Sequence, residues 1–166
     1  MIRLLVEDDA EGYLRLRREM LVDSPLSFSS SPDDASAASL DDTRQQLRRG
    51  PESVVLGAFE PELVGAVGLY RDPHLKASYK VHLWGMYVAP AHRSQGIARG
   101  LLDAAIAHAA KLSGVEWIHL GVSSAAPAAR RLYASAGFEE WGAEPDALRH
   151  AGESAVEYHL ARRLNA

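Results

Sequence analysis

The strongest constraint on this chain lies in residues 81–102, where an apolar, β-rich run ends at a proline and a glycine-containing turn leads directly into a helix. Pro90 closes the run, Gly96 lies in the turn, and a helical apolar pattern begins at Ile97. The first N–H groups of a helix have no intrahelical acceptors, and the helix dipole adds partial positive charge there. The segment therefore predicts a strand, an anion-binding turn and a helix, with phosphate or pyrophosphate as the ligand.

Spacing disfavours two common phosphate-binding loops. Gly96 is followed by Ile97 and Ala98 rather than by Lys and Ser or Thr, so the segment is not the P-loop of an ATP or GTP site. The G-x-G-x-x-G fingerprint that follows the first strand of NAD-binding domains is also missing. Arg93 and Arg99 flank the turn, and both can make charge-assisted contacts to phosphate oxygens.

Two motifs in register resemble the general N-acetyltransferase (GNAT) superfamily. The first is Arg-x-x-Gly-x-Ala at Arg93, Gly96 and Ala98, with Tyr-Val-x-Pro before it and Leu-Leu after it. The second is Leu-Tyr-x-x-x-Gly-Phe, from Leu132 to Phe138. Together they are more specific than either alone. The resemblance implies an α/β (α+β) GNAT fold, with a central mixed, mostly antiparallel sheet of about six to seven strands flanked by about four helices.

Hydrophobic periodicity predicts elements in an order that suits this fold. Strands are predicted at 2–6, 53–59, 63–70, 81–88, 117–122, 138–141 and 154–160. Helices are predicted from Asp8 or Asp9 to Ser24, and at 40–49, 97–112 and 127–137. The segments 24–38, 71–79 and 143–154 are polar or lack a period, and we expect them to be loops that recognise the second substrate.

Length and composition favour one domain over residues 1–166. A chain of 166 residues with 47% hydrophobic content can bury a single core. A net charge of −4 argues against a general nucleic-acid binder, and the absence of cysteine removes disulfides and thiol nucleophiles. No signal-peptide core or membrane-spanning apolar run is evident. We therefore expect a cytoplasmic protein that binds neither nucleic acid nor membrane.

The resemblance also implies acetyl-CoA as cosubstrate and the residues that hold it. Acetyl-CoA is expected between the strands 81–88 and 117–122, which splay apart in this family. The pantetheine arm is expected on the backbone of Met86, Tyr87 and Val88, and the pyrophosphate on Arg93, Ser94, Gln95, Gly96, Ile97, Ala98 and Arg99. Tyr133 is expected to face the thioester sulfur. The chain departs from the family at Ala126, where relatives often carry asparagine, and either Ser123 or Ser124 replaces that side chain or backbone groups alone hold the cofactor there.

Acetyl transfer to an amine needs a base that takes the ammonium proton and an acid that protonates the leaving thiolate. Tyr133 is the predicted acid, because a phenol stays protonated at neutral pH. The base stays open between His82, His119 and a water relay. Strand alternation predicts one shared face for Lys80, His82, Trp84, Met86 and Val88. The histidines show no metal-ligand spacing, so we expect no metal.

The sequence therefore predicts an acetyl-CoA-dependent N-acetyltransferase that moves an acetyl group to a primary amine by direct attack in a ternary complex. The alternative is a non-catalytic GNAT-fold protein that binds CoA or acyl-CoA as a sensor or assembly partner. The acceptor is expected to be a small-molecule or peptide amine, and family members often pair, which implies a homodimer. The candidate aromatic residues of the acceptor pocket are Phe28, Tyr70, Trp84 and Trp141.

Overall fold

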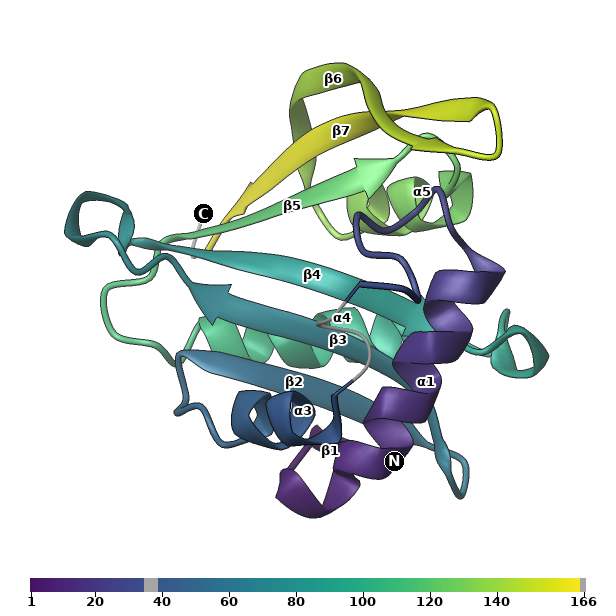
Figure 1. Ribbon diagram of the computed structural model, residues 1–166. Helices are drawn as coiled ribbons and strands as arrows, with labels where there is room; N and C mark the ends of the chain where they lie inside the picture. The colour runs from purple at the N-terminus through teal and green to yellow at the C-terminus, as the bar shows by residue number, and fades with distance from the viewer. Residues whose placement is uncertain (35–38, 165–166) are drawn as a thin grey trace.

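The fold is built on one mixed sheet. The computed structural model describes residues 1–34 and 39–164, and in them the chain forms a seven-stranded sheet in the order β1-β2-β3-β4-β5-β7-β6 (Figure 1). The β4–β5 pair is parallel and the other neighbours are antiparallel. The predicted α/β (α+β) fold with a mostly antiparallel sheet is confirmed. The last residues of the predicted loop 24–38, residues 35–38, lie outside the described residues.

The elements follow the predicted order. The strands are β1 Ile2–Leu4, β2 Ser53–Phe59, β3 Leu63–Arg71, β4 Lys80–Val88, β5 Trp117–Ser123, β6 Glu139–His150 and β7 Glu153–Arg163. The α-helices of the described ranges are α1 Ala10–Asp23, α3 Leu40–Leu47, α4 Ile97–Ala109 and α5 Pro127–Ser135. Short 3₁₀ turns cover Glu7–Asp9, Leu75–Ala77 and Pro90–His92.

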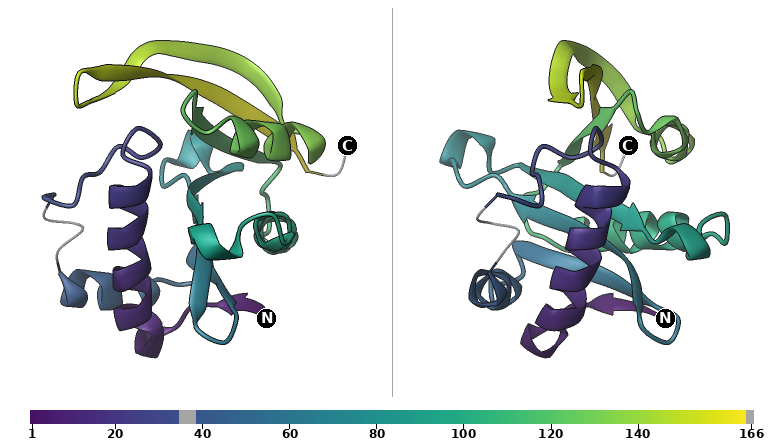
Figure 2. Two further views of the ribbon diagram at one scale, coloured as in Figure 1. Left: turned by 90° about the vertical axis from the view of Figure 1, so that its right-hand side faces the viewer. Right: turned by 45° about the vertical axis from the view of Figure 1, so that its right-hand side comes forward.

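Helices cover both faces of the sheet and create two apolar clusters. Figure 2 shows α1 and α3 on one face and α4 on the other. In the first cluster, Leu101 and Leu102 of α4 and Tyr133 of α5 pack against Ile118 of β5. In the second, residues of α1 pack against Tyr87 of β4. No helix of the described ranges is long and apolar enough to span a membrane.

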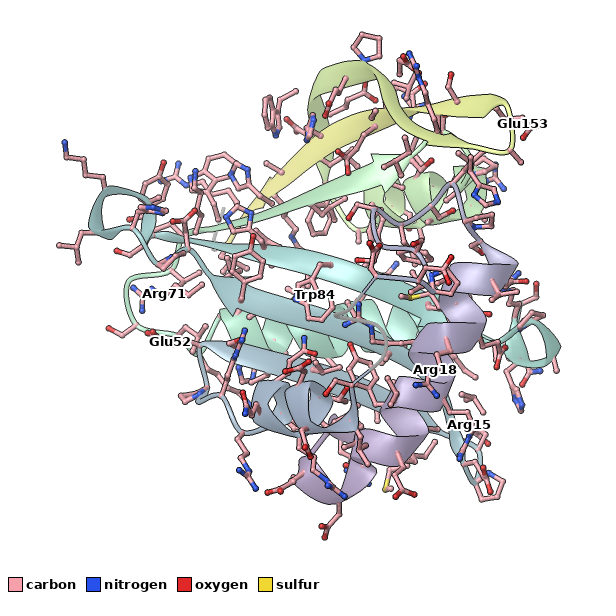
Figure 3. All side chains as sticks on the ribbon, viewed as in Figure 1. Arg15, Arg18, Glu52, Arg71, Trp84 and Glu153 are labelled. Atoms are coloured by element: carbon pink, nitrogen blue, oxygen red, sulfur yellow. The ribbon has the colours of Figure 1, made fainter. Side chains whose placement is uncertain are left out.

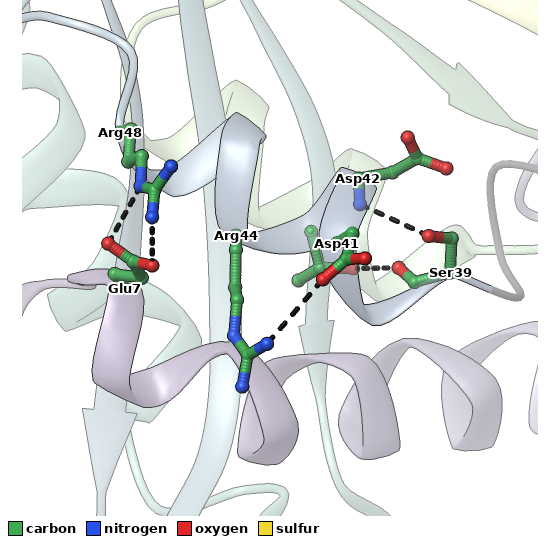
Figure 4. A network of polar contacts seen from close by, with 7 residues as sticks. Glu7, Ser39, Asp41, Asp42, Arg44 and Arg48 are labelled. Atoms are coloured by element: carbon green, nitrogen blue, oxygen red, sulfur yellow. Dashed lines mark hydrogen bonds and ion pairs between the residues drawn. The ribbon is translucent and has the colours of Figure 1, made fainter.

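Polar contacts fix α3 beside the start of α1. The Ser39 hydroxyl accepts from the N–H of Asp42 at 3.2 Å and so caps the first turn of α3 (Figure 4). Near the other end of the helix, the Arg48 guanidinium donates to both carboxylate oxygens of Glu7 (Figure 4). The helix is thereby held next to the chain segment that leads into α1.

The predicted single face of β4 is wrong in its second half because the strand contains a bulge. Gly85 has φ +61, and the register with β3 shifts between Trp84 and Tyr87. The extra residue reverses the alternation. Met86 therefore packs in the first cluster, which contains residues of α4, whereas Trp84 packs in the second cluster, which contains residues of α1. A glycine suits this position because it adopts positive φ without steric cost.

The predicted loop 143–154 is also wrong, since most of this segment belongs to the long β6–β7 hairpin. Pro145 and Gly152 made the sequence look like a loop. In the structure, a bulge between Glu144 and Leu148 accommodates the proline in β6, which is an edge strand, and Gly152 lies in the hairpin turn. The hairpin thus supplies a wall rather than a loop beside β5.

Candidate functional site

The site lies where two neighbouring parallel strands separate. β4 and β5 pair only through Lys80, Val81 and His82, with Trp117, Ile118 and His119 opposite. Beyond this point the two strands diverge, as Figure 1 shows. From Leu83 onward, the edge of β4 that faces β5 has no strand partner within the described residues. Apart from the Val88 carbonyl, which accepts from Arg93 Nε, the backbone N–H and C=O groups on this edge are therefore available to a ligand.

A cavity of about 340 Å³ opens in this cleft. Its walls come from the segment after α1, from residues 83–86 of β4, from residues 120–123 of β5, from α5, and from the β6–β7 hairpin. Most of these lining residues are apolar. Tyr133 and Glu157 are the only ionisable side chains among the described residues that line it.

Tyr133 presents a protonated phenol to the cavity. Its side chain is 6% exposed, and its ring packs edge-on against Phe138 at a centroid distance of 5.8 Å. Burial raises the pKa of the Tyr133 phenol above its ordinary value, so the proton is held at neutral pH. The hydroxyl makes no hydrogen bond to any residue that the structure describes. It is thus free to donate to a ligand.

The turn before α4 carries a row of free amides. Ser94 has φ 62 and Gly96 has φ 80, both in the left-handed region, and α4 begins at the next residue, Ile97. Within residues 1–34 and 39–164, no acceptor faces the backbone N–H groups from Ser94 to Arg99. Together with the helix dipole, these donors form an anion-binding surface.

The side chains of the two arginines in this turn already have partners. Arg93 donates through Nε to the Val88 carbonyl at 2.9 Å and through Nη2 to Asp23 at 2.5 Å. Arg99 donates to Asp103 at 2.9 Å. Arg93 Nη1 and both Nη atoms of Arg99 have no hydrogen-bond partner among the described residues, so the predicted charge-assisted contacts to phosphate can form while these ion pairs are kept. The backbone amides are also free.

The two histidine candidates for the base lie at the paired end of β4 and β5, outside the lining of the cavity. His82 has its Nε2 at 3.1 Å from Asp72 Oδ2, and its ring stacks on Tyr70. The ring centroids of His119 and His82 are 6.0 Å apart. The pKa of the His119 imidazole is lowered, mainly because burial disfavours its charged form. Their catalytic roles stay predictions.

Ala126, which replaces the frequent asparagine, is the residue before α5, and it lines the cavity without a side-chain cap. The serines that could substitute for it are engaged elsewhere. The Ser123 hydroxyl donates to the Leu26 carbonyl at 2.6 Å, and the Ser124 hydroxyl accepts from the N–H of Val156 at 3.0 Å. Ser123 thereby ties the segment after α1 to the end of β5.

The cavity is lined by two of the four aromatic residues predicted for an acceptor pocket and by one charged residue that was not predicted. Of the four predicted aromatic residues, Phe28 and Trp84 line the cavity, whereas Tyr70 and Trp141 do not. Glu157 was not singled out, because no motif surrounds it. The one available signal was a carboxylate in the middle of a predicted strand, between Val156 and Tyr158.

Comparisons with known proteins are consistent with this geometry. The model of the acetyltransferase (GNAT) family matches residues 15–138, and no curated protein matches the sequence. A ribosomal-protein-alanine N-acetyltransferase from Brucella melitensis is 25% identical, with a TM-score of 0.84 and 99% of both chains covered. A putative acetyltransferase from Salmonella typhimurium, solved with its cofactor acetyl-CoA, is 20% identical, with a TM-score of 0.85 and coverage of 100% of this chain and 94% of that one. A phosphinothricin acetyltransferase from Sinorhizobium meliloti, in complex with acetyl-CoA, is 18% identical, with a TM-score of 0.84 and coverage of 99% and 88%.

The ion pair between Arg93 and Asp23 predicts a pH-dependent contribution to stability. A hydrogen bond from the Arg93 guanidinium holds the pKa of Asp23 below its ordinary value of about 3.9. The pair therefore stabilises the fold above that value, and the contribution is lost as the pH falls through the lowered pKa. Asp23→Asn should lower the free energy of unfolding at pH 7 by up to about 1 kcal/mol, and the difference should shrink as the pH falls below the ordinary pKa of an aspartate.

Urea denaturation from pH 7 to pH 2 measures this difference. Asp33→Asn is the matched control, because Asp33 is exposed in the segment after α1. A difference between Asp23→Asn and the unmodified protein that stays constant over the whole pH series would contradict the prediction.

Proposed function

This chain belongs to the acetyltransferase (GNAT) family, and we propose that it transfers the acetyl group of acetyl-CoA to a primary amine by direct attack in a ternary complex. The observation that carries the proposal is the cleft between β4 and β5. The free amides at the start of α4 follow the exposed β4 edge in the chain, and the cavity beside that edge contains a protonated phenol among mostly apolar residues. Such a cleft suits a long ligand that is anionic at one end and reactive at the other.

Backbone groups are proposed to hold the donor. The unpaired edge of β4 at Met86, Tyr87 and Val88 suits the amide groups of a pantetheine arm, which add to the sheet like a further strand. The free amides of residues 94–99 suit a pyrophosphate. Acetyl-CoA supplies the activated acyl group as a thioester.

Tyr133 is proposed as the general acid. A raised phenol pKa keeps the proton available until a thiolate forms next to it, and the thiolate, whose conjugate acid has a pKa of about 8.5, then accepts it. A neutral amine needs no covalent enzyme intermediate, which suits a chain without cysteine. For the base, the sequence left His82, His119 and a water relay, and neither histidine lines the cavity.

Because neither histidine lines the cavity, a second candidate function is also favoured. In this alternative the protein binds CoA or acyl-CoA without catalysing a transfer. Such a protein would use the same free amides and strand edge, and it would need no base. The two functions differ in whether CoA thiol is released when an amine is added.

We expect acetyl-CoA to raise the melting temperature of the protein, because it binds the native state, and CoA thiol to appear when a broad panel of primary amines is added. Thermal shift and a thiol-reactive dye measure the two effects. A thermal shift without thiol release from any amine would leave only the non-catalytic function. The absence of a thermal shift would contradict both functions.

Gly96→Ala should weaken acetyl-CoA binding by about tenfold or more, which corresponds to a loss of roughly 1.4 kcal/mol or more in binding free energy. Alanine at φ 80 is strained, so the turn changes its backbone conformation and the free amides lose their alignment. Calorimetric titration with acetyl-CoA measures the affinity.

Gly152→Ala is the matched control for this effect. Gly152 has φ 81 and, like Gly96, has open space within 4 Å of the position that a Cβ would take, but it lies in the β6–β7 turn. It should carry the same backbone strain while keeping the acetyl-CoA affinity of the unmodified protein. Equal affinity losses in the two variants would show that general destabilisation, not the turn, is responsible.

Tyr133→Phe should lower turnover at saturating acetyl-CoA by about 10²- to 10⁴-fold, which is the usual contribution of general acid catalysis. The ring keeps its packing against Phe138, so the acetyl-CoA-dependent rise in melting temperature should be retained. Tyr79→Phe, at an exposed tyrosine, is the control and should be fully active. Unchanged turnover of Tyr133→Phe would remove the acid role.

A further inference from the structure

Glu157 is the only charged side chain among the described residues that line the cavity. It lies on β7 and is half-buried. No lysine, arginine or histidine lines the cavity with it. The interior of the cleft therefore carries an uncompensated negative charge at this point, which favours a cationic ligand group and disfavours an anionic one.

The Glu157 carboxylate extends over the backbone of β5. A Cβ built on Gly121 would lie 2.4 Å from Glu157 Oε1 and 2.8 Å from its Cδ, so any side chain at residue 121 would displace the carboxylate. The glycine at this position leaves room for Glu157 to reach from β7 across β5 toward the cleft.

Glu157 and Tyr133 approach the cleft from opposite faces of the sheet. In the strand register Glu157 lies opposite Ser123, whose hydroxyl bonds to Leu26 in the segment after α1. Tyr133 packs in the cluster on the α4 face. A carbonyl carbon held in the cleft would therefore have the phenol on one side and the carboxylate on the other, where the leaving and attacking groups of an acyl transfer belong.

The surroundings of Glu157 leave its charge unpaired. Among the residues that the structure describes, none forms an ion pair or hydrogen bond with it. Its neighbour directly opposite on β6 is another carboxylate, Glu144. Like charges directly across a strand pair repel, so a cation from solution stabilises this arrangement. His159 is the third polar side chain here, and its Nε2 lies 3.8 Å from Glu144.

Of these three groups only Glu157 lines the cavity. One ligand atom each from Glu144, Glu157 and His159 lie within 4.8 Å of one another, so the three side chains form one polar cluster at the edge of the cavity. Glu157 is the member of this cluster that a ligand in the cavity can contact.

We propose that Glu157 binds the ammonium group of the acceptor and removes its proton, and that the acceptor is a primary amine with no carboxylate on the amine-bearing carbon. This inference rests on the proposed acetyl transfer. Phe28 and Trp84 line the same cavity and suit an aromatic or apolar body on the amine. The Arg17 guanidinium lies over the Trp84 ring at 5.6 Å but is not part of the lining, so it does not offset Glu157 there.

The proton balance of the transfer closes with these two residues. Glu157 takes one proton from the ammonium, and the neutral amine forms the C–N bond to the acetyl carbon. When the C–S bond breaks, the electron pair stays on sulfur, and Tyr133 gives the thiolate its proton. One of the two protons that remain on nitrogen is lost as the amide forms and restores the phenol through water, and the other stays in the amide N–H. Glu157 returns its proton to solvent, so one proton is released for each acetyl group transferred.

Binding of two matched probes tests the selection of the acceptor. We expect 2-phenylethylamine to bind the protein saturated with CoA at least about tenfold more tightly than phenylalanine, which differs only by the carboxylate. Glu157→Gln should remove this preference. Glu153→Gln, at an exposed residue near the turn end of the same strand (Figure 3), should keep it. Isothermal titration calorimetry with CoA in place of acetyl-CoA measures binding without turnover.

Kinetics test the removal of the proton. Glu157→Gln should lower kcat/KM for 2-phenylethylamine by about 10²- to 10⁴-fold at neutral pH and leave the KM for acetyl-CoA unchanged. The deficit should shrink as the pH approaches the pKa of the amine, because solvent then supplies the neutral form. A merely structural role of Glu157 would give a deficit that does not depend on pH and would overturn the catalytic part of the proposal.

Different results would overturn the role of Glu157 and the proposed acetyl transfer. Equal binding of the two probes, binding of neither, or tight zinc binding that Glu157→Gln abolishes overturns the role of Glu157 in selecting the acceptor. If the binding preference is present and depends on Glu157 but no amine releases CoA thiol, acetyl transfer is wrong and Glu157 is an ammonium-binding residue only.

Discussion

The short parallel pairing between β4 and β5 is the constraint on which the rest of the site depends. Only three residues of β4 pair with three residues of β5, and this contact keeps the sheet continuous at one end. Beyond it, β5 follows β7, whereas β4 stays with β3. One strand edge is therefore exposed in the middle of a protein rather than at the rim of its sheet. A ligand that pairs with this edge satisfies backbone groups that would otherwise need water.

The bulge at Gly85 determines which side chains face the opened cleft. Because it adds one residue to β4, Trp84 and Met86 lie on opposite faces of the sheet although both line the cavity. The cleft thus has an aromatic wall on the α1 side and a thioether on the α4 side. A regular strand would have placed both side chains on the same face.

Local features were predictable from the sequence, and long-range register was not. Pro90, Gly96 and the helical stripe of α4 act within a few residues of one another, so their pattern predicts the strand, turn and helix directly. The bulge at Gly85 and the strand that runs through Pro145 depend on partners elsewhere in the sheet. A glycine or proline in isolation does not reveal whether a bulge accommodates it. Glu157 is the extreme case, since its position follows from the pairing of β7 with β5 and from the missing side chain of Gly121.

The hydrogen bond from Ser123 to Leu26 joins residues that are far apart in the chain, and it shows how the two halves of the site are encoded. The residues of the proposed donor half come from one contiguous stretch of the chain, from β4 through α4 and β5 to α5. The opposite wall is assembled from the segment after α1 and from the β6–β7 hairpin. Substitutions in those two segments can alter the wall without touching the turn or Tyr133. If the proposed roles hold, acceptor preference can diverge in evolution while the proposed donor half stays unchanged.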